Sequence, residues 1–177
     1  MKKIIISILL FGLSLPVFSQ VLTHQKTEIK FEIDTRFGKA NGEFKKVTLE
    51  VLDAKAKKAK VEIDVASIDT GNSIRDNHLR NEDFFDVPNF PKASFEVLSV
   101  KENSPNSLIL TGKLTIKNIE KTYDIPVSLS EDAQSAQYSG SVGINRKDFQ
   151  INYDSMINPI KDLAKVQFTV TFEKKGK

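Results

Sequence analysis

The sequence predicts an all-β antiparallel fold, on three observations. Apolar and polar residues alternate in about eight segments, which is the period of strands with one buried face. Short turns join most of these segments, and no long crossover helix is predicted between them, which excludes parallel β-α-β units. The chain has no cysteine, so its core must hold it together without disulfides. A sandwich and a closed barrel both fit this pattern, and a barrel is favoured because closure removes exposed sheet edges.

The first 19 residues have the pattern of a secretory signal peptide. The basic start Met1–Lys3 precedes an apolar run from Ile4 to Val17, and small or apolar residues follow at the expected cleavage site. The run is shorter than the ~20 residues of a membrane-spanning helix, which disfavours the alternative of a retained anchor. We therefore expect cleavage of residues 1–19, no transmembrane segment afterwards, and a single domain over residues 20–177.

Composition and motifs exclude several classes of function. Two of the 26 basic residues, Lys2 and Lys3, leave with the signal peptide, so the mature chain carries nearly equal numbers of basic and acidic residues. This balance gives no support for a nucleic-acid partner. The absence of cysteine excludes thiolate chemistry, and the sequence contains no nucleophile elbow, phosphate-binding loop or HExxH motif.

The alternating segments also predict local irregularities. In order, the predicted strands are Ile29–Ile33, Val47–Val51, Val61–Val65, Phe95–Val100, Leu108–Ile116, Tyr123–Leu129, Tyr138–Ile144 and Val166–Phe172. The glycines and asparagine within Arg36–Gly42 favour a turn. The apolar residues shift from odd to even positions at Val97–Leu98, which predicts a β-bulge. Asn118 tolerates the left-handed conformation that a tight turn after Ile116 requires.

A single crossover, near residues 73–91, interrupts the strands. Ser73 and Asp76 have the spacing of a capping box, which predicts a helix start, and Asp76 is also positioned to pair with Arg80. The helix would end near Asn81 after about two turns, too short to be stable alone. It must therefore pack against other elements, and an aromatic cluster that includes Phe84 and Phe85 follows it directly.

The crossover carries a long ordered motif that resembles the YceI-like family. It reads S-I-D-T-G-N-x-x-R-D-x-H-L-x-x-x-D-F-F-D-V, then P-x-x-S-F, with L-T-G-K-L-T-I-K and I-N-R-K-D-F later in the chain. The resemblance spans roughly residues 27–172. It implies an extended, eight-stranded, lipocalin-like barrel in the periplasm of a Gram-negative bacterium, with a polyisoprenoid or isoprenoid quinone in the lumen. The chain departs from the family at Asn118 and Gln150, where glycine is usual.

The inward-facing apolar positions are the candidate lining of that lumen. An isoprene unit of five carbons gains about 3–4 kcal/mol on burial, at ~0.8 kcal/mol per CH₂ and before ordering costs, so a chain needs apolar walls rather than charged contacts. Plain core packing is the alternative role for each position. The candidates are Phe31, Ile33, Val61, Ile63, Phe84, Phe85, Phe95, Leu110, Leu114, Ile116, Tyr123, Ile125, Val142, Phe168 and Val170, with Phe84 and Phe85 placed to close one end.

The polar residues of the motif are interpreted as structural. Asp69, Arg75, Asp76 and His78 are expected to form a hydrogen-bond network that pins the helix to one end of the barrel. The chain has only two histidines, with no spaced pair, so neither a metal site nor another cofactor is expected. We accordingly expect a binding protein with no catalytic residues rather than an enzyme.

Three functions remain open from the sequence. The first is a secreted periplasmic protein that binds, carries or sequesters an isoprenoid-type lipid, as a monomer or homodimer. The second is an envelope stress or interaction module with a filled core and no lipid. The third is an enzyme acting on a lipid head group, which would require titratable groups to converge at the barrel mouth.

Overall fold

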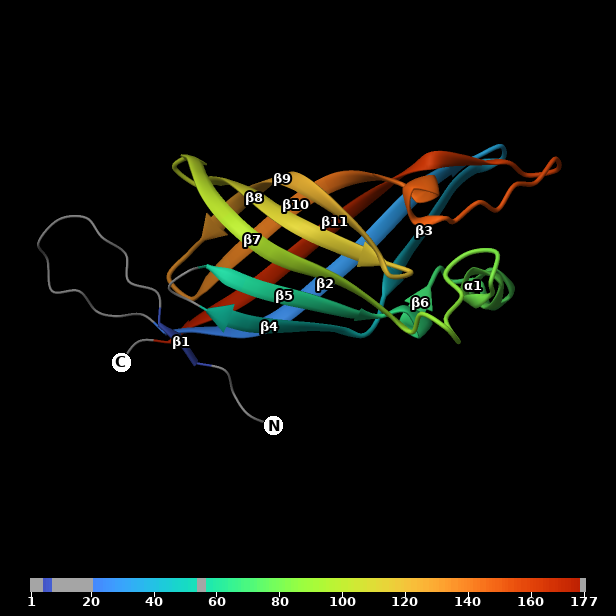
Figure 1. Ribbon diagram of the computed structural model, residues 1–177. Helices are drawn as coiled ribbons and strands as arrows, with labels where there is room; N and C mark the ends of the chain where they lie inside the picture. The colour runs from blue at the N-terminus through green and yellow to red at the C-terminus, as the bar shows by residue number, and fades with distance from the viewer. Residues whose placement is uncertain (1–4, 8–20, 54–56, 176–177) are drawn as a thin grey trace, which may run out of the picture.

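The computed structural model describes residues 5–7, 21–53 and 57–175. Their strands form one curled antiparallel sheet, and α1 (Ser73–Arg80) lies at one end of it (Figure 1). This confirms the predicted fold class. The strands are β1 (Ile5–Ser7), β2 (Val21–Thr35), β3 (Gly38–Phe44), β4 (Val47–Asp53), β5 (Lys58–Asp64), β6 (Ile68–Asp69), β7 (Lys92–Ser104), β8 (Ser107–Ile116), β9 (Ile119–Glu131), β10 (Ser135–Asn145) and β11 (Ile160–Lys175). Two 3₁₀ turns, η1 (Val65–Ser67) and η2 (Arg146–Phe149), follow β5 and β10.

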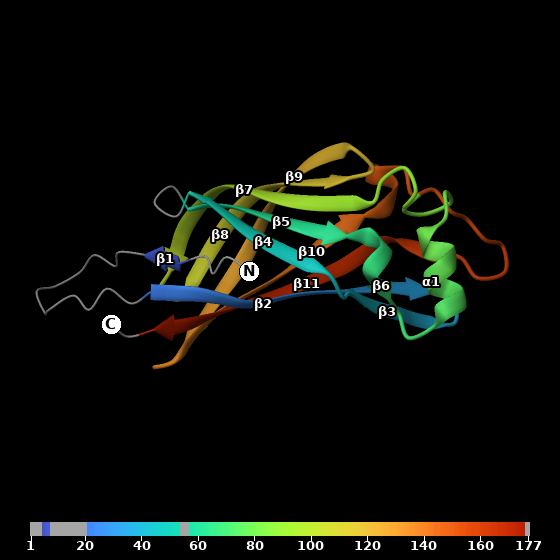
Figure 2. The ribbon, with the colours of Figure 1, turned by 90° about the horizontal axis from the view of Figure 1, so that it is seen from below.

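The sheet curls back on itself through a bent strand. Neighbouring strands run in the order β4-β5-β7-β8-β9-β10-β11-β2-β3-β6. β3 pairs with β2, whereas β4, which follows it after two residues, pairs with β5. Beyond this bend, β4 and β2 lie side by side without pairing (Figure 2). The sheet has eleven strands rather than eight because β3 and β4 are halves of one bent strand, β6 continues β5, and β1 lies in the predicted signal peptide. Apart from β1, that signal peptide lies outside the described residues.

Two predicted irregularities are confirmed. The register between β7 and β8 shifts at Leu98, so this residue forms the bulge that the parity change indicates. β8 and β9 are joined by Lys117 and Asn118 alone, both at positive φ (50° and 59°). A two-residue connection with both residues left-handed is the hairpin turn that matches the twist of antiparallel strands.

The turn predicted within Arg36–Gly42 is confined to Arg36 and Phe37, and residues 38–44 form β3, in which Gly42 pairs with Phe31. Residues 21–28, which precede the first predicted strand, extend β2 and pair with the end of β11. Gln25 is an extra residue in that pairing, so Thr27 and His24 both face the interior although they are three residues apart.

The helix lies where the motif predicts, but its contacts differ. The N-cap is Asn72, not Ser73, and its Oδ1 accepts the backbone amides of residues 74 and 75, each at 3.1 Å. Arg80 does not pair with Asp76. It donates instead to the carbonyls of Ala66 (2.9 Å) and Ile68 (2.8 Å), which ties the end of α1 to the turn between β5 and β6.

One cluster of the buried core lies in the half of the interior nearest α1. Ile29 of β2 and Ile63 of β5 meet there across the curled sheet, together with Val65 and Ala93. Because strands from opposite sides of the sheet share this cluster, the face that carries these residues is the inside of the barrel. Partly buried side chains complete the cluster: Phe44, Val47, Val61, Phe85, Val87, Ile116, Val166 and Phe168.

Candidate functional site

The candidate site is the apolar interior of the curled sheet. None of the fifteen predicted lining residues is exposed: Ile63, Phe84, Leu114 and Ile125 are buried, and the other eleven are half-buried. Those eleven are Phe31, Ile33, Val61, Phe85, Phe95, Leu110, Ile116, Tyr123, Val142, Phe168 and Val170. Side chains on the inner face of a fully packed barrel would lose nearly all contact with solvent. These eleven side chains instead keep part of their apolar surface accessible.

Three glycines keep phenylalanine rings against the wall of this interior. The ring of Phe168 lies over Gly140 of the neighbouring strand, so closely that a Cβ at Gly140 would come within 2.6 Å of its Cζ. The rings of Phe31 and Phe95 lie over Gly42 and Gly112 in the same way. Because each ring occupies the place of a missing side chain, it follows the wall instead of reaching across the barrel.

Phenylalanines pack together at the end of the interior nearest α1. Phe44 packs against Phe31 (ring centroids 5.7 Å apart) and against Phe85 (6.2 Å), which belongs to the core cluster. Phe84 has different neighbours: its ring lies 5.0 Å from that of His78 and 4.7 Å from that of Tyr153. Of the two residues predicted to close this end, Phe85 thus packs inside and Phe84 joins a separate aromatic group.

The predicted polar residues hold α1 in place. Asp76, only 7% exposed, accepts the backbone amide of Thr70 at 2.9 Å and its hydroxyl at 2.5 Å. Arg75 donates to the same hydroxyl and to the Thr70 carbonyl, each at 2.8 Å. Asp69 accepts the amide of Gly71, and this bond, together with a nearby lysine, holds the pKa of Asp69 below its usual value. These three side chains converge on the turn before α1.

His78 lies apart from that turn. It stands edge-on to Phe84 and Tyr153, and its Nε2 lies 3.3 Å from an oxygen of Asp83. Among the described residues, no three histidine or acidic side chains come together in a way that would hold a metal ion. Within the same residues, no helix is both long and apolar enough to cross a bilayer.

Sequence reasoning missed the segment that packs against His78. Arg146, only 7% exposed, donates to the carbonyls of Ile151 (2.7 Å) and Tyr153 (2.8 Å) and to Asp162 (2.9 Å). It thereby fixes the connection between η2 and β11, which presents Tyr153 to α1. The arginine of the I-N-R-K-D-F motif was the available signal, but its partners are backbone carbonyls that no sequence pattern marks.

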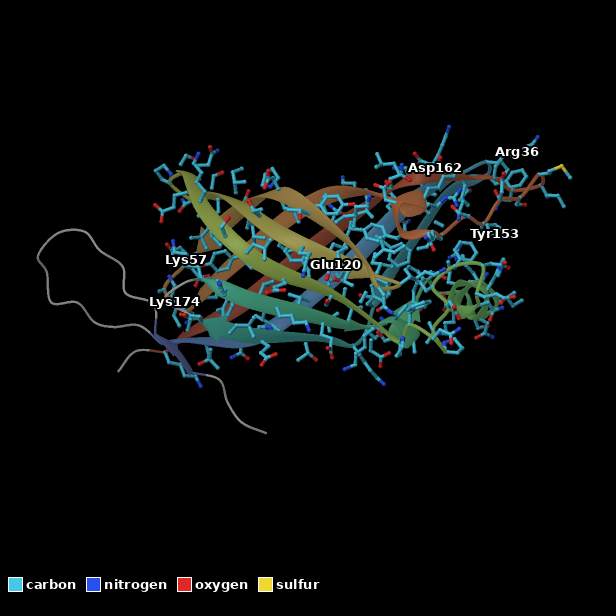
Figure 3. All side chains as sticks on the ribbon, viewed as in Figure 1. Arg36, Lys57, Glu120, Tyr153, Asp162 and Lys174 are labelled. Carbon is cyan, nitrogen blue, oxygen red and sulfur yellow. The ribbon has the colours of Figure 1, made fainter. Side chains whose placement is uncertain are left out.

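A second missed group lies at the other end of the barrel. Figure 3 shows Lys174 at the end opposite Tyr153. There the ring of Phe172 stands between those of His24 (5.8 Å) and Tyr138 (5.9 Å), edge-on to both. Burial lowers the pKa of His24 and raises that of Tyr138, so both side chains favour their uncharged forms. The interior thus has an apolar end near α1 and a polar end away from it, where the side chains of His24 and Tyr138 are uncharged.

Comparison with known proteins identifies the relatives of this chain. It is 35% identical over 125 residues to a UPF0312 protein of Pseudomonas aeruginosa. The matched segment covers 67% of this chain and 63% of that protein. A UPF0312 protein of Staphylococcus aureus is 35% identical over 115 residues, 61% of this chain and 64% of its own length. The chain thus spans a little less than two thirds of these curated relatives.

Solved structures show the same fold. BcnA of Burkholderia cenocepacia superposes with a TM-score of 0.74 at 26% identity, over 82% of this chain and 95% of that one. A polyisoprenoid binding domain from Saccharophagus degradans gives 0.69 at 15% identity, over 87% and 97%. The YceI-like domain itself matches residues 21–172. The protein therefore belongs to the YceI-like family.

Proposed function

We propose that this protein binds an isoprenoid-type lipid, a polyisoprenoid or an isoprenoid quinone, inside the barrel. The observation that carries the proposal is the half-buried apolar face that lines the curled sheet, with three phenylalanine rings lying over glycines. Along β11, the wall from Val166 to Phe172 is about 20 Å long at ~3.3 Å per residue, enough for an extended chain of several isoprene units. A polyisoprenoid binding domain is among the proteins that share this fold, which supports the same role here.

The proposal extends to cell location and mode of action. The amino-terminal signal pattern supports export, and we infer a periplasmic protein that carries or sequesters its lipid, as a monomer or homodimer. The proposed function includes no catalytic step. Asp69, Arg75 and Asp76, which an enzyme acting on a lipid head group would have needed, are engaged in fixing α1.

Solvent extraction tests the binding proposal. The mature chain, purified from the periplasm of an expressing bacterium, is extracted with organic solvent and the extract is analysed by mass spectrometry. We expect an isoprenoid lipid in near one-to-one amount with protein, and reloading of the emptied protein by added isoprenoid quinone. Extracts free of apolar chains from every preparation, together with no uptake of added lipid, would contradict the proposal.

Two neighbouring substitutions on β10 provide a matched pair. Val142 faces the interior and pairs with Val166, whereas Ser141, beside it, faces outward and is exposed. Val142→Phe fills part of the proposed channel and should lower lipid loading several-fold, while Ser141→Phe should leave loading unchanged. Equal loading of both variants, each with an intact far-ultraviolet spectrum, would place the lipid elsewhere.

A further inference from the structure

The end of the interior opposite α1 has a polar lining that the proposed lipid-binding function does not by itself require. Across β10, β11 and β2, one row of paired residues is Ala136, Phe172 and His24, and the next is Tyr138, Val170 and Thr27. These residues share the inner face with the apolar rows that follow toward α1. The pairing thus brings the hydroxyls of Tyr138 and Thr27 and the imidazole of His24 to the same end of the barrel.

The side chains of these rows hold each other in place. The Nε2 of His24 lies 2.9 Å from the hydroxyl of Thr27. Phe172 separates the rings of His24 and Tyr138, with edge-on contacts of 5.8 and 5.9 Å. Because both rings lie against Phe172, their polar atoms occupy fixed positions on the wall.

An ion pair lies beyond these rows without adding net charge. Lys174 follows Phe172 on the inner face of β11, and its side chain is 11% exposed. Its ammonium lies 2.8 Å from a carboxylate oxygen of Glu131 and donates to the carbonyl of Asp132 at 2.8 Å. Glu131 pairs with Ala136, in the row of His24. The lysine charge is therefore already matched by a carboxylate.

We propose that this end of the barrel is a head-group site, formed chiefly by Tyr138, Thr27 and the Glu131–Lys174 pair, that selects uncharged, hydrogen-bonding head groups over phosphates. The inference rests on the proposed function, because it assumes that an isoprenoid chain occupies the apolar part of the interior. A hydroxyl or a quinone carbonyl bonds to the hydroxyl of Tyr138 at this site. A phosphate brings negative charge next to Glu131, and Lys174, the cation described on this face, is already paired with that carboxylate.

The physical basis is the cost of bringing an unpaired charge out of water. A charged group that enters a partly buried site loses hydration, and only a close opposite charge makes up for the loss. Lys174 supplies that charge only if it leaves Glu131. A neutral head group loses less hydration, and hydrogen bonds to fixed protein groups replace the bonds that it made to water.

The test uses one tetraprenyl chain with four different ends: hydrocarbon, hydroxyl, benzoquinone and phosphate. Binding to the mature protein is measured by competition with a fluorescent lipid. We expect the hydroxyl and quinone forms to bind about tenfold tighter than the hydrocarbon, an effect the size of one or two hydrogen bonds, and the phosphate to bind no tighter than the hydrocarbon. Phosphate binding as tight as that of the quinone overturns the proposal.

Two substitutions localise the effect. Glu131→Gln leaves Lys174 without its carboxylate and should raise phosphate affinity about tenfold with little change for the hydrocarbon. Tyr138→Phe should reduce hydroxyl and quinone binding toward the hydrocarbon value. Tyr153→Phe, which removes a hydroxyl beside α1 from a residue outside the predicted lining, is the matched control and should leave the ranking intact. Thermal unfolding of each variant establishes that it is folded.

The outcomes separate this inference from the binding proposal. If the hydrocarbon binds but all four ends bind alike, the head-group site is wrong and the lipid channel stands. If Tyr153→Phe has the effect expected of Tyr138→Phe, the head group lies near the α1 end and the assignment is again wrong. If none of the four compounds binds, both proposals fail together. Should Glu131→Gln not fold, the comparison of Tyr138→Phe with Tyr153→Phe still decides between these results.

Discussion

Glycines facing phenylalanines determine how much of the interior stays open. At Gly42, Gly112 and Gly140, a ring from a neighbouring strand lies where a side chain would otherwise project. The alternation of the sequence predicted which residues face the interior, and none of them is exposed. It could not show that Phe168 lies over Gly140, because that contact depends on the register between β10 and β11. The strand pairing therefore shows what the sequence pattern could not, namely that these rings lie along the inner face of the sheet.

Gly140→Ala tests this arrangement. A methyl group there comes within 2.6 Å of Phe168, so the ring must turn into the interior, with a cost of about 1–3 kcal/mol in the free energy of unfolding and a loss of lipid capacity. Gly143→Ala is the control, since its new methyl meets only the exposed Leu163 side chain, which can move. Urea unfolding and lipid loading measure both effects. Equal effects of the two substitutions would contradict the role given to Gly140.

Gln150 and Asn118 both have a backbone conformation that favours glycine. Both lie at positive φ, 55° and 59°. Asn adopts this conformation more readily than Gln, because its short side chain bonds locally. Gln150→Gly should therefore stabilise the protein by about 1 kcal/mol, whereas Asn118→Gly should change little. Thermal unfolding measures both, and a destabilised Gln150→Gly variant would show that its side chain has a role the backbone does not reveal.

At the scale of elements, α1 depends on contacts distant in sequence. Its residues include none of the apolar positions of the core cluster, and Ile74 is 82% exposed. The helix is held instead by hydrogen bonds, from Thr70 to Asp76 and from Arg80 to two backbone carbonyls. The ring of Tyr153 also packs against that of His78. The motif predicted where the helix begins to within one residue, and it indicated Asp76 as an anchor. It did not predict the carbonyl partners of Arg80 or the contact with Tyr153, because such partners leave no trace in a local pattern.

Arg80→Ala tests this anchoring. The change removes the bonds to the carbonyls of Ala66 and Ile68 and should cost about 2 kcal/mol. Amide hydrogen exchange should then speed up over residues 73–90 while β8 to β10 remain protected. Arg36→Ala is the control, because that guanidinium contacts only the ring of Phe37 among the described residues. Unchanged exchange around α1 would mean that other contacts hold the helix.

The bent strand shows a further limit of sequence patterns. Residues 38–44 contain two glycines and an asparagine, which favour a turn by composition. The segment is nevertheless β3, because pairing with β2 and the ring of Phe31 over Gly42 outweigh local preference. Strand pairing of this kind is a tertiary effect and overrides propensity.

The whole molecule should lose stability in two steps as pH falls. Burial lowers the pKa of His24 below 6.5, so the unfolded chain binds a proton first and stability falls as pH drops below 6.5. Backbone amides hold the pKa values of Asp69 and Asp132 below 3.8, and the Lys147 ammonium does so for Asp162. Their contribution is present above pH 3.8 and is lost below it.

His24→Gln separates the two steps. The variant should lack the loss of stability that begins near pH 6.5 and keep the loss at lower pH. Urea midpoints measured from pH 7.5 to pH 3 for both proteins provide the comparison. If the variant still loses stability from about pH 6.5, that step belongs to another titrating group. The result would then contradict the burial of His24 inside the barrel.

A crystal structure of the mature protein loaded with a tetraprenyl quinone would locate the lipid. We expect a chain inside the barrel along β11, with its tail against Phe85 and its ring beside Tyr138. Phenylalanine rings turned inward to fill the barrel, with the quinone on the outer surface or absent, would overturn the proposed lipid channel.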